Sequence, residues 1–296
     1  MKSQRSASVV LIVAVVCVSS GSILIRMADA PALTVALYRL GYAAIIHALL
    51  SVPGRRDYLR FDRGTLLKSL AAGAALSVHF VLWILSLDHT TVAASTVLMS
   101  FHPVFTAVFA YVALGETLSR GQMVSVVLAL IGTIVIAGGA HFAGGSLLGD
   151  GLALAGGAAL AVYLLVGRQV RERISTLTYT TVVYSFAAVC VMVLMVILGR
   201  PLGGGGPREH LIFVALAVVP TLLGHTLLNW SLAHIQAFDV SASALGEPVG
   251  ATLLAYFLLH EVPAPHQLAG GAMVLVALGL LLRNRNAAGR LRLSGR

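Results

Sequence analysis

Charged residues are scarce in this chain, and that scarcity excludes an ordinary soluble domain. Of its 296 residues only 10% are charged, whereas 58% are hydrophobic and the mean hydropathy is +0.93. A soluble domain carries roughly 25% charged residues and about 45–50% apolar ones. No long polar stretch remains in which a water-soluble domain could fold. The composition therefore predicts a chain that lies in a lipid bilayer.

Signatures of catalysis and metal binding are also missing. The two cysteines, Cys17 and Cys190, lie inside apolar runs and give neither a disulfide framework nor zinc spacing. The chain contains no G-x-x-x-x-G-K-[ST], H-E-x-x-H or G-x-S-x-G motif. The histidines in or near apolar segments have no fixed spacing: His79, His89, His102 and His225. We therefore expect no cofactor, no metal site and no ATP-driven step.

Ten segments are apolar and long enough to cross a bilayer, since a span needs about 20 mostly apolar residues. They cover approximately residues 8–25, 32–52, 65–86, 91–113, 120–138, 149–167, 177–198, 210–232, 238–259 and 266–282. The first segment follows Lys2 and Arg5 in the manner of a secretory signal, but its apolar run is long for one and Pro31 would directly follow the cut. The expected fold is all-α, with ten transmembrane helices.

Basic residues are divided unequally between the two sides of the membrane. If the N-terminus is cytoplasmic, the outside loops hold three, and the cytoplasmic segments hold fifteen: Lys2, Arg5, Arg55, Arg56, Arg60, Arg63, Arg120, Arg168, Arg171, Arg173, Arg283, Arg285, Arg290, Arg292 and Arg296. This asymmetry predicts cytoplasmic termini in a bacterial-type inner (plasma) membrane. It also explains the net charge of +9 through contact with lipid headgroups, without a nucleic-acid partner.

The chain contains an internal repeat with an offset of 145 residues. Identical residues recur in register in both copies: Ser86 and Ser231, His89 and His234, Pro103 and Pro248, Tyr111 and Tyr256, Glu116 and Glu261, Gln122 and Gln267. Five spans per copy is an odd number, so the copies are inverted relative to each other, as in many alternating-access transporters. We expect a first five-helix repeat over 1–140, a second over 149–283 and a basic cytoplasmic tail over 284–296.

Two stretches of the repeat resemble the EamA-type transporters of the drug/metabolite transporter superfamily. In the first copy they are residues 87–98, then His102-Pro103-Val104-Phe105 and Leu114-Gly115-Glu116; in the second they are Glu247-Pro248 and Leu259-His260-Glu261. The resemblance covers about residues 8–282. It implies a ten-helix inverted-repeat fold with a central cavity, in a carrier that often moves small metabolites outward. His102 before the first proline and His260 before the second loop glutamate depart from the usual residues.

A titratable residue precedes a proline near the middle of span four and of span nine. Glu247 stands before Pro248, and its repeat mate His102 stands before Pro103. Ionisable groups in hydrocarbon cost about 2.5–3.5 kcal/mol each on insertion scales. A proline frees a backbone carbonyl and bends the helix, and broken helices near the midplane hold substrate and coupling ions. Glu247 is thus a candidate for binding a proton or a substrate ammonium, with His102 assisting; the alternative is a structural hydrogen bond for each.

Further candidates for the cavity lie on other spans. Arg39 could grip a substrate carboxylate or pair with Glu247, or else extend to the surface. His79 with Trp83, and His225 with Asn229, are spaced i and i+4 and share helix faces. Asp239 at the start of span nine is expected to be an N-cap. The full candidate cavity set is Glu247, His102, His79, Arg39, Trp83, Tyr38, Tyr163, His225 and Asn229, with Pro103 and Pro248 as the bends.

The sequence favours a secondary transporter and leaves two other classes open. The expected function is export of amino acids or related polar and aromatic compounds, with a small-molecule substrate, membrane lipids and the proton as candidate coupling ion. A membrane-embedded enzyme would need a clustered acid/base constellation, which the sequence lacks. A channel or scramblase would need a pore or filter, and no such pattern is present. Substrate, direction and oligomeric state are not specified by the sequence.

Overall fold

The computed structural model describes residues 2–51, 58, 61–90, 92–138, 146–171, 173–260 and 262–294. Several residues used above lie outside this part of the chain: the loop 139–145 between the expected repeats, and Arg55, Arg56, Arg60, Glu261 and Arg296.

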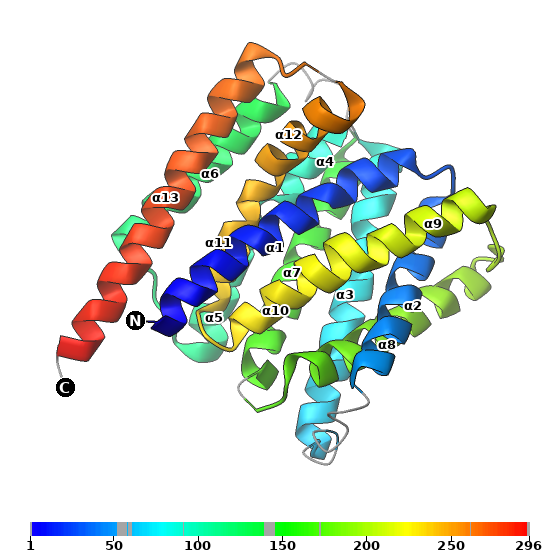
Figure 1. Cartoon of the computed structure of the whole chain (residues 1–296), viewed down its shortest axis with the longest axis horizontal. Coiled ribbons are helices and arrows are strands. Elements are labelled where there is room, and N and C mark those ends of the chain that lie inside the picture. Colours follow the sequence, from blue (N-terminus) through cyan, green and yellow to red (C-terminus); the bar gives the residue numbers. More distant parts are fainter. Residues whose placement is uncertain are drawn as a thin grey trace.

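Every regular element in the described residues is a helix (Figure 1). In chain order they are α1 (Lys2–Met27), α2 (Ala32–Ser51), α3 (Arg63–His89), α4 (Val92–Met99), α5 (His102–Leu114), α6 (Arg120–Ala137), α7 (Leu147–Arg171), α8 (Thr176–Ile197), α9 (Pro207–Leu216), the π-helix η3 (Ala217–His225), α10 (Thr226–Leu232), α11 (Ala237–Ser243), the 3-10 helix η4 (Ala244–Gly246), α12 (Glu247–Leu259) and α13 (Pro265–Ser294).

The ten predicted spans are confirmed, with ends that differ by a few residues apart from the longer first and last helices. Nine helical stretches in the described residues are long and apolar enough to cross a membrane. The tenth, span nine, is divided into α11, η4 and α12. Spans four and eight are also composite, because α4 and α5 form one and α9, η3 and α10 form the other. The last helix, α13, continues through most of the predicted tail.

The helices pack with the pseudo-twofold relation that inverted repeats require. Span three packs on span six (α3 on α7), and its repeat mate, span eight, packs on span one (η3 and α10 on α1). Span one packs on span nine, and span six packs on span four. The other three pairs are repeat mates that pack on each other: span two on span seven, span four on span nine, and span five on span ten. The fold is therefore an all-α bundle of two inverted five-helix repeats.

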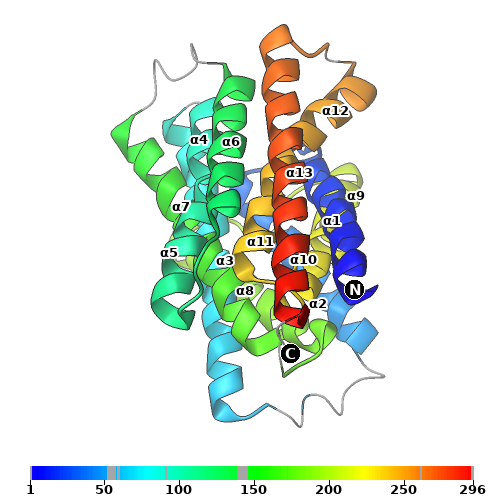
Figure 2. The ribbon, with the colours of Figure 1, turned by 90° about the vertical axis from the view of Figure 1, so that its left-hand side faces the viewer.

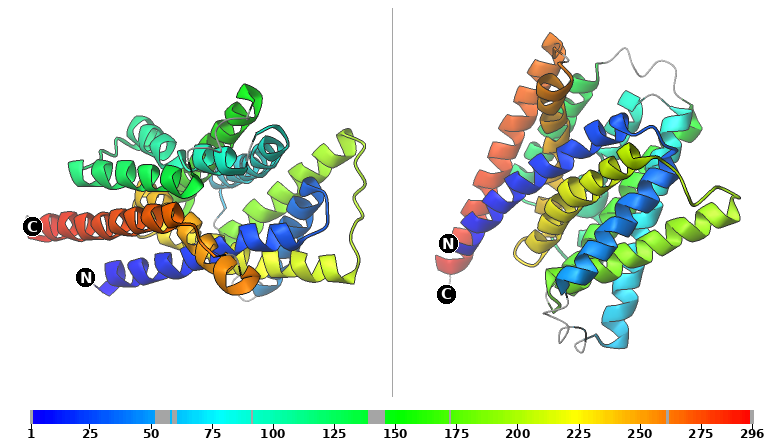
Figure 3. Two further views of the ribbon diagram at one scale, coloured as in Figure 1. Left: turned by 90° about the horizontal axis from the view of Figure 1, so that it is seen from above. Right: turned by 45° about the vertical axis from the view of Figure 1, so that its right-hand side comes forward.

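Both chain ends lie at one end of the bundle, which we call the terminal face (Figure 2). The other end, where α1 finishes at Met27 and α13 begins at Pro265, is called the distal face. α6 and α13 form a pair along one side of the bundle (Figure 3). They approach closely at Gly132 and Gly270. A Cβ added at Gly132 would lie 2.8 Å from Gly270 O, and a Cβ added at Gly270 would lie 2.5 Å from Gly132 O. Small residues permit such contact between helices in lipid, where no hydrophobic force drives association.

Spans four and nine are interrupted at corresponding depths. Span four breaks between Met99 and His102, and span nine breaks at η4, directly before Glu247. Pro103 and Pro248 each stand in the first turn of the second segment, a position that tolerates proline because its N–H needs no helical partner. Each proline thus starts a new helix at mid-depth.

Span eight contains an irregularity that the sequence analysis did not anticipate. The nine residues of η3 have π-helical hydrogen bonding around Pro220. Proline lacks an N–H and crowds the carbonyl one turn earlier, and a wider turn relieves that conflict. The widened segment places Thr221 and His225 toward the centre of the bundle.

Candidate functional site

A cavity of about 140 Å³ lies between the two halves. Its lining includes Val18, Gly21, Ser22, Ile25, Arg39, His79, Phe80, Trp83, Thr96, Met99, Ser100, His102, Leu160, Leu164, His225, Leu228, Val240, Ala244, Glu247, Pro248 and Ala251. The contributions of α1 and α3 come from the parts of those helices nearer the distal face, whereas those of α4 and α12 come from the mid-depth ends of these two helices. A volume of this size corresponds to about five water molecules, so the described conformation suits a small metabolite.

Arg39 is a buried cation on the cavity wall, with 5% of its surface exposed. Its Nε donates to Thr221 Oγ1 at 2.8 Å, which ties α2 to the π-helical segment. Its guanidinium carbon lies 4.8 Å from the centre of the Phe80 ring. A guanidinium over an aromatic face is held by a cation–π attraction that grows as water is excluded. This burial contradicts the alternative in which the Arg39 side chain extends to the surface.

Glu247 brings the opposite charge to the same cavity from the first residue of α12. Arg39 interacts electrostatically with its carboxyl group. The carboxyl also stands at a helix N-terminus, where the helix dipole favours negative charge. The cavity therefore holds one basic and one acidic side chain, supplied by opposite halves of the fold.

The remaining wall is formed by aromatic rings and histidines. His79 Nδ1 donates to the carbonyl oxygen of Gly156 at 3.1 Å, which fixes the ring against α7. The His79 ring is nearly parallel to Trp83, with an interplanar angle of 8° and centroids 6.4 Å apart. His225 lies on the other side of Phe80, with ring centroids 6.2 Å apart. These residues give the cavity apolar faces with few polar atoms.

His102 joins the two broken spans to each other. Its Nδ1 lies 2.6 Å from the hydroxyl oxygen of Ser241 on α11. The hydroxyl of Thr106 lies 3.0 Å from the same Ser241 oxygen and 2.8 Å from the carbonyl oxygen of His102. His102 therefore lines the cavity and also connects α5 to α11.

Three of the candidate residues lie away from this cavity. Tyr38 stacks on Phe213 with ring centroids 5.1 Å apart and donates to Leu202 O at 3.2 Å, close to the distal face. Tyr163 and Asn229 are fully buried against each other, with Asn229 Nδ2 donating to Tyr163 Oη at 2.5 Å. The structure thus gathers Arg39, His79, Trp83, His102, His225 and Glu247, with Pro248, around the cavity.

Asp239 corrects the sequence analysis. The N-cap of α11 is Gln236, and Asp239 lies inside the helix with 3% of its surface exposed. Its Oδ1 accepts a hydrogen bond from Gln122 Nε2 at 2.9 Å, which joins α6 to α11. The position of Asp239 at the start of span nine indicated a cap, but its hydrogen bond to a distant helix determines the role of this carboxylate.

Polar contacts cross the bundle near the terminal face. Arg168 on α7 donates to Leu232 O at 3.0 Å, and Arg171 Nε donates to Asn229 O at 3.2 Å. Both arginines therefore hold the end of α7 against α10. At the same face Asp62 caps α3, and hydrogen bonds from Thr65 lower the pKa of the Asp62 carboxyl. These contacts lie on the opposite side of the cavity from its distal-face lining.

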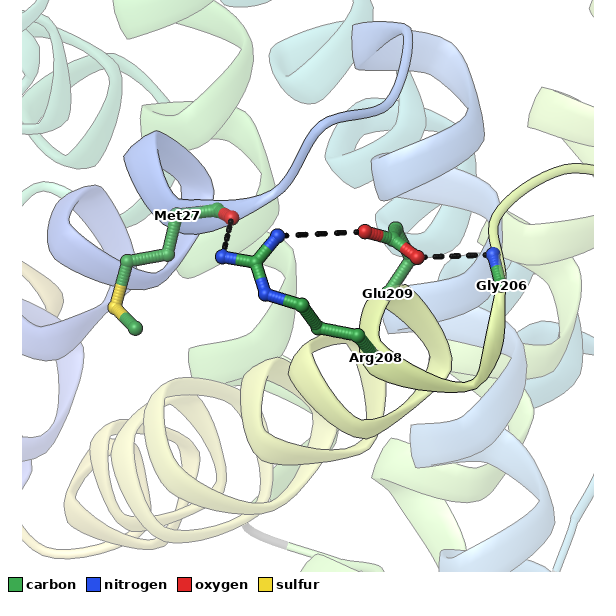
Figure 4. A network of polar contacts seen from close by, with 4 residues as sticks. All are labelled: Met27, Gly206, Arg208 and Glu209. Carbon is green, nitrogen blue, oxygen red and sulfur yellow. Dashed lines mark hydrogen bonds and ion pairs between the residues drawn. The ribbon is translucent and has the colours of Figure 1, made fainter.

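A polar network at the distal face connects α1 to α9 (Figure 4). Arg208 donates to Met27 O and to Glu209 Oε1, both at 3.4 Å. The other carboxylate oxygen of Glu209 accepts from Gly206 N at 2.9 Å. The network fixes the first turn of α9 beside the last turn of α1, so these helix ends are held together at the cavity's distal side.

Sequence reasoning missed Thr221, Phe80 and Ser241 as partners of the candidate residues. The sequence did contain one signal for Thr221, because Pro220 interrupts an apolar span and marks an irregular turn. Phe80 and Ser241 carried none, since a phenylalanine or serine in an apolar span is ordinary packing material.

Comparisons with known proteins agree with the fold of two repeats. The EamA-like transporter family matches the chain twice, over residues 5–138 and 147–283. A relative from Streptantibioticus cattleyicolor named "Probable terminal-alkyne amino-acid exporter" is 25% identical over 225 residues, covering 76% of this chain and 74% of its own. An uncharacterized transporter from Archaeoglobus fulgidus is 25% identical over 279 residues, covering 94% and 96%. A crystal structure with 18% identity superposes with a TM-score of 0.78 over 93% of this chain and 96% of its own.

Proposed function

The chain belongs to the EamA-like transporter family, and from this membership and the cavity we propose that it exports amino acids or related polar and aromatic compounds as a secondary transporter. The halves over 1–140 and 149–283 are the units that alternate the access of the cavity between the two sides. One relative carries the name of an amino-acid exporter, which supports this substrate class.

One observation carries the proposal: the basic residue Arg39 and the acidic residue Glu247 line one small cavity. An amino acid is a zwitterion with its carboxylate and ammonium on the same carbon. The Arg39 guanidinium would bind the carboxylate through paired hydrogen bonds, as planar guanidinium groups do. The Glu247 carboxylate would bind the ammonium, and the rings of Phe80 and Trp83 would contact the side chain.

Proton coupling follows from competition for the Glu247 carboxyl. An ionised carboxylate in a membrane interior is costly unless a cation compensates it. A substrate ammonium and a proton are the two mobile groups that provide this compensation. We therefore propose exchange, in which a proton that binds Glu247 from outside displaces the substrate and is released inside when the next substrate binds.

The direction depends on the orientation of the chain. With the termini in the cytoplasm of a bacterial-type inner membrane, the described conformation would be outward-facing, because α1 and α3 line the cavity with their segments nearer the distal face and polar contacts cross the bundle on the terminal side. The contacts of Gln122, Arg168 and Arg171 would then form the closed cytoplasmic side. Export requires that these contacts separate while the distal side closes.

The test is an untargeted comparison of culture media. Cells express the wild-type protein, the Glu247→Gln variant or an empty vector, with equal amounts in the membrane. We expect a compound to accumulate outside only with the wild type, and its identity to give the substrate class. Arg200→Gln is a matched control, because Arg200 lies in a distal-face loop outside the cavity lining. Matching media for all four strains would remove most of the support for export.

A membrane-embedded enzyme is the alternative class. Family membership favours transport, and the paired charges of the cavity suit binding without a nucleophile. Purified protein that chemically alters candidate compounds in detergent would favour the enzyme, because a carrier leaves them unchanged.

A further inference from the structure

A second hollow lies on the membrane-facing side of the bundle, between α1 and α13. This groove has a volume of about 400 Å³, and η4 and the start of α12 form its floor. Its lining is aliphatic except for three serines: Ser8, Leu11, Ile12, Val15, Val16, Ser19, Ser243, Gly246, Val249, Gly250, Leu253, Leu275, Leu278, Gly279 and Leu282. In Figure 1, α11 and α12 lie between α1 and α13, the two helices that flank the groove.

The polar groups of the groove have partners within the protein. Ser19 Oγ donates to Val15 O at 2.7 Å, and Ser243 Oγ donates to Asp239 O at 2.7 Å. Several aliphatic side chains of the rim remain exposed, including Ile12 at 56% and Leu275 at 57%. The groove thus offers van der Waals contact and few hydrogen bonds, which fits a hydrocarbon chain.

The groove and the central cavity share a wall that is one helix thick. Five residues of span nine line the cavity: Val240, Ala244, Glu247, Pro248 and Ala251. A different five line the groove: Ser243, Gly246, Val249, Gly250 and Leu253. Within each set the residues follow spacings of one to four, so each set shares one side of span nine, and the two sides face two different hollows. The 3-10 turn that precedes Glu247 lies within this wall. Whatever fills the groove therefore supports the backbone that carries Glu247.

Basic residues stand at the terminal-face end of the groove. On α13 the last lining residue, Leu282, is followed directly by Arg283, whose side chain is exposed. Arg285 follows in the sequence, and α1 carries Lys2 and Arg5 just before Ser8. The two chain ends lie near each other in Figures 2 and 3. Clusters of lysine and arginine at the ends of transmembrane helices attract anionic lipid headgroups.

We propose that the groove binds one acyl chain of an anionic phospholipid, whose phosphate lies at the basic ends of α1 and α13. The bound chain packs against Val249 and Leu253 of span nine, because the space over Gly246 and Gly250 is already taken by side chains of α1 and α13. An unfilled groove would leave these two side chains with fewer contact partners. The lipid therefore stabilises the interrupted form of span nine and, insofar as Glu247 has the role proposed above, the transport cycle depends on it.

Gly279 permits a direct test. It lines the groove, and an added Cβ there meets no atom within 4 Å. Gly279→Phe therefore fills the groove from α13, and Gly279→Leu fills it with a smaller side chain. Gly151 on α7 is equally open and exposed but lies far from the groove in the sequence and on another helix, so Gly151→Phe is the matched control.

The measurement is native mass spectrometry of the purified full chain titrated with palmitoyl-oleoyl phosphatidylglycerol. We expect one lipid to bind to the wild type and to Gly151→Phe, and binding to Gly279→Phe to be weaker by about tenfold or more. Arg283→Gln should reduce the preference for phosphatidylglycerol over phosphatidylcholine about fivefold, the effect of one basic residue near a membrane surface. The readout is lipid binding, so it is independent of whether export is found.

Equal lipid binding by Gly279→Phe and Gly151→Phe would overturn the proposal, and so would equal binding of the two lipid classes by the wild type. If Gly279→Phe does not fold, as judged by its thermal unfolding, the same comparison is made with Gly279→Leu. A wild-type dimer that Gly279→Phe converts to a monomer would assign the groove to a second copy of the chain and would also overturn the lipid assignment.

Discussion

Replacing Arg39 with lysine tests how the cavity recognises a carboxylate. Lysine keeps the positive charge but lacks the planar fork, so it loses one of two paired hydrogen bonds to a carboxylate. It also loses the Nε hydrogen bond to Thr221 that fixes the guanidinium. A hydrogen bond to a charged group contributes about 1.5–3 kcal/mol. Since 1.4 kcal/mol is a factor of ten, we expect substrate affinity to fall by about 10- to 100-fold.

The assay is competition for transport in proteoliposomes, with the amino acid found by the export screen and its carboxamide. The wild type should bind the carboxamide about 10- to 100-fold more weakly than the amino acid, by the same estimate. Arg39→Lys should discriminate much less between the amino acid and its carboxamide, because the hydrogen bond that lysine cannot make to the carboxylate is the one that the carboxamide lacks as well. Arg200→Lys is the control. Unchanged discrimination in Arg39→Lys would refute the assignment of Arg39 to the carboxylate.

Three further predictions follow from other contacts. Ser241→Ala removes the partner of His102 and should lower stability by about 1 kcal/mol, measured by thermal unfolding in detergent; a His102→Ala, Ser241→Ala cycle with no coupling would contradict the contact. His260→Gly should raise stability by about 1 kcal/mol, because His260 has φ 55° and left-handed backbone disfavours a side chain; a lower unfolding temperature would count against this. Asp62 has a lowered pKa in the folded chain, so its contribution to the start of α3 is present above the usual Asp pKa and is lost as the pH falls through the lowered value. The hydrogen-exchange protection factor of the Thr65 amide should therefore fall in acid, and an unchanged protection factor would contradict the cap.

The sequence predicted those features that depend on position along the chain. Hydropathy fixed the spans, and His102-Pro103 and Glu247-Pro248 marked the helix breaks because proline cannot continue a preceding helix. The repeat also explains His260, since its mate Gly115 has φ 66° and both residues end their helices in left-handed backbone. A histidine thus occupies a site that suits glycine.

Features that depend on helix rotation were not predictable. Tyr163 lies between Leu160 and Leu164 in the sequence, yet those two leucines line the cavity and Tyr163 faces α10. The rotation of α7 is set by close approaches at its glycines; an added Cβ at Gly157 would lie 3.0 Å from Met99 O. Such approaches depend on the partner helix, so the same spacing could have placed Tyr163 in the cavity.

Flux measured in proteoliposomes tests the central claim most directly. Purified wild-type protein and Glu247→Gln are reconstituted separately, loaded with the compound found by the export screen, and subjected to an imposed pH gradient. The account predicts saturable efflux through the wild type that the gradient accelerates, and no acceleration for Glu247→Gln. Efflux that rises linearly with concentration, or equal acceleration of both proteins by the gradient, would contradict a carrier that couples protons through Glu247.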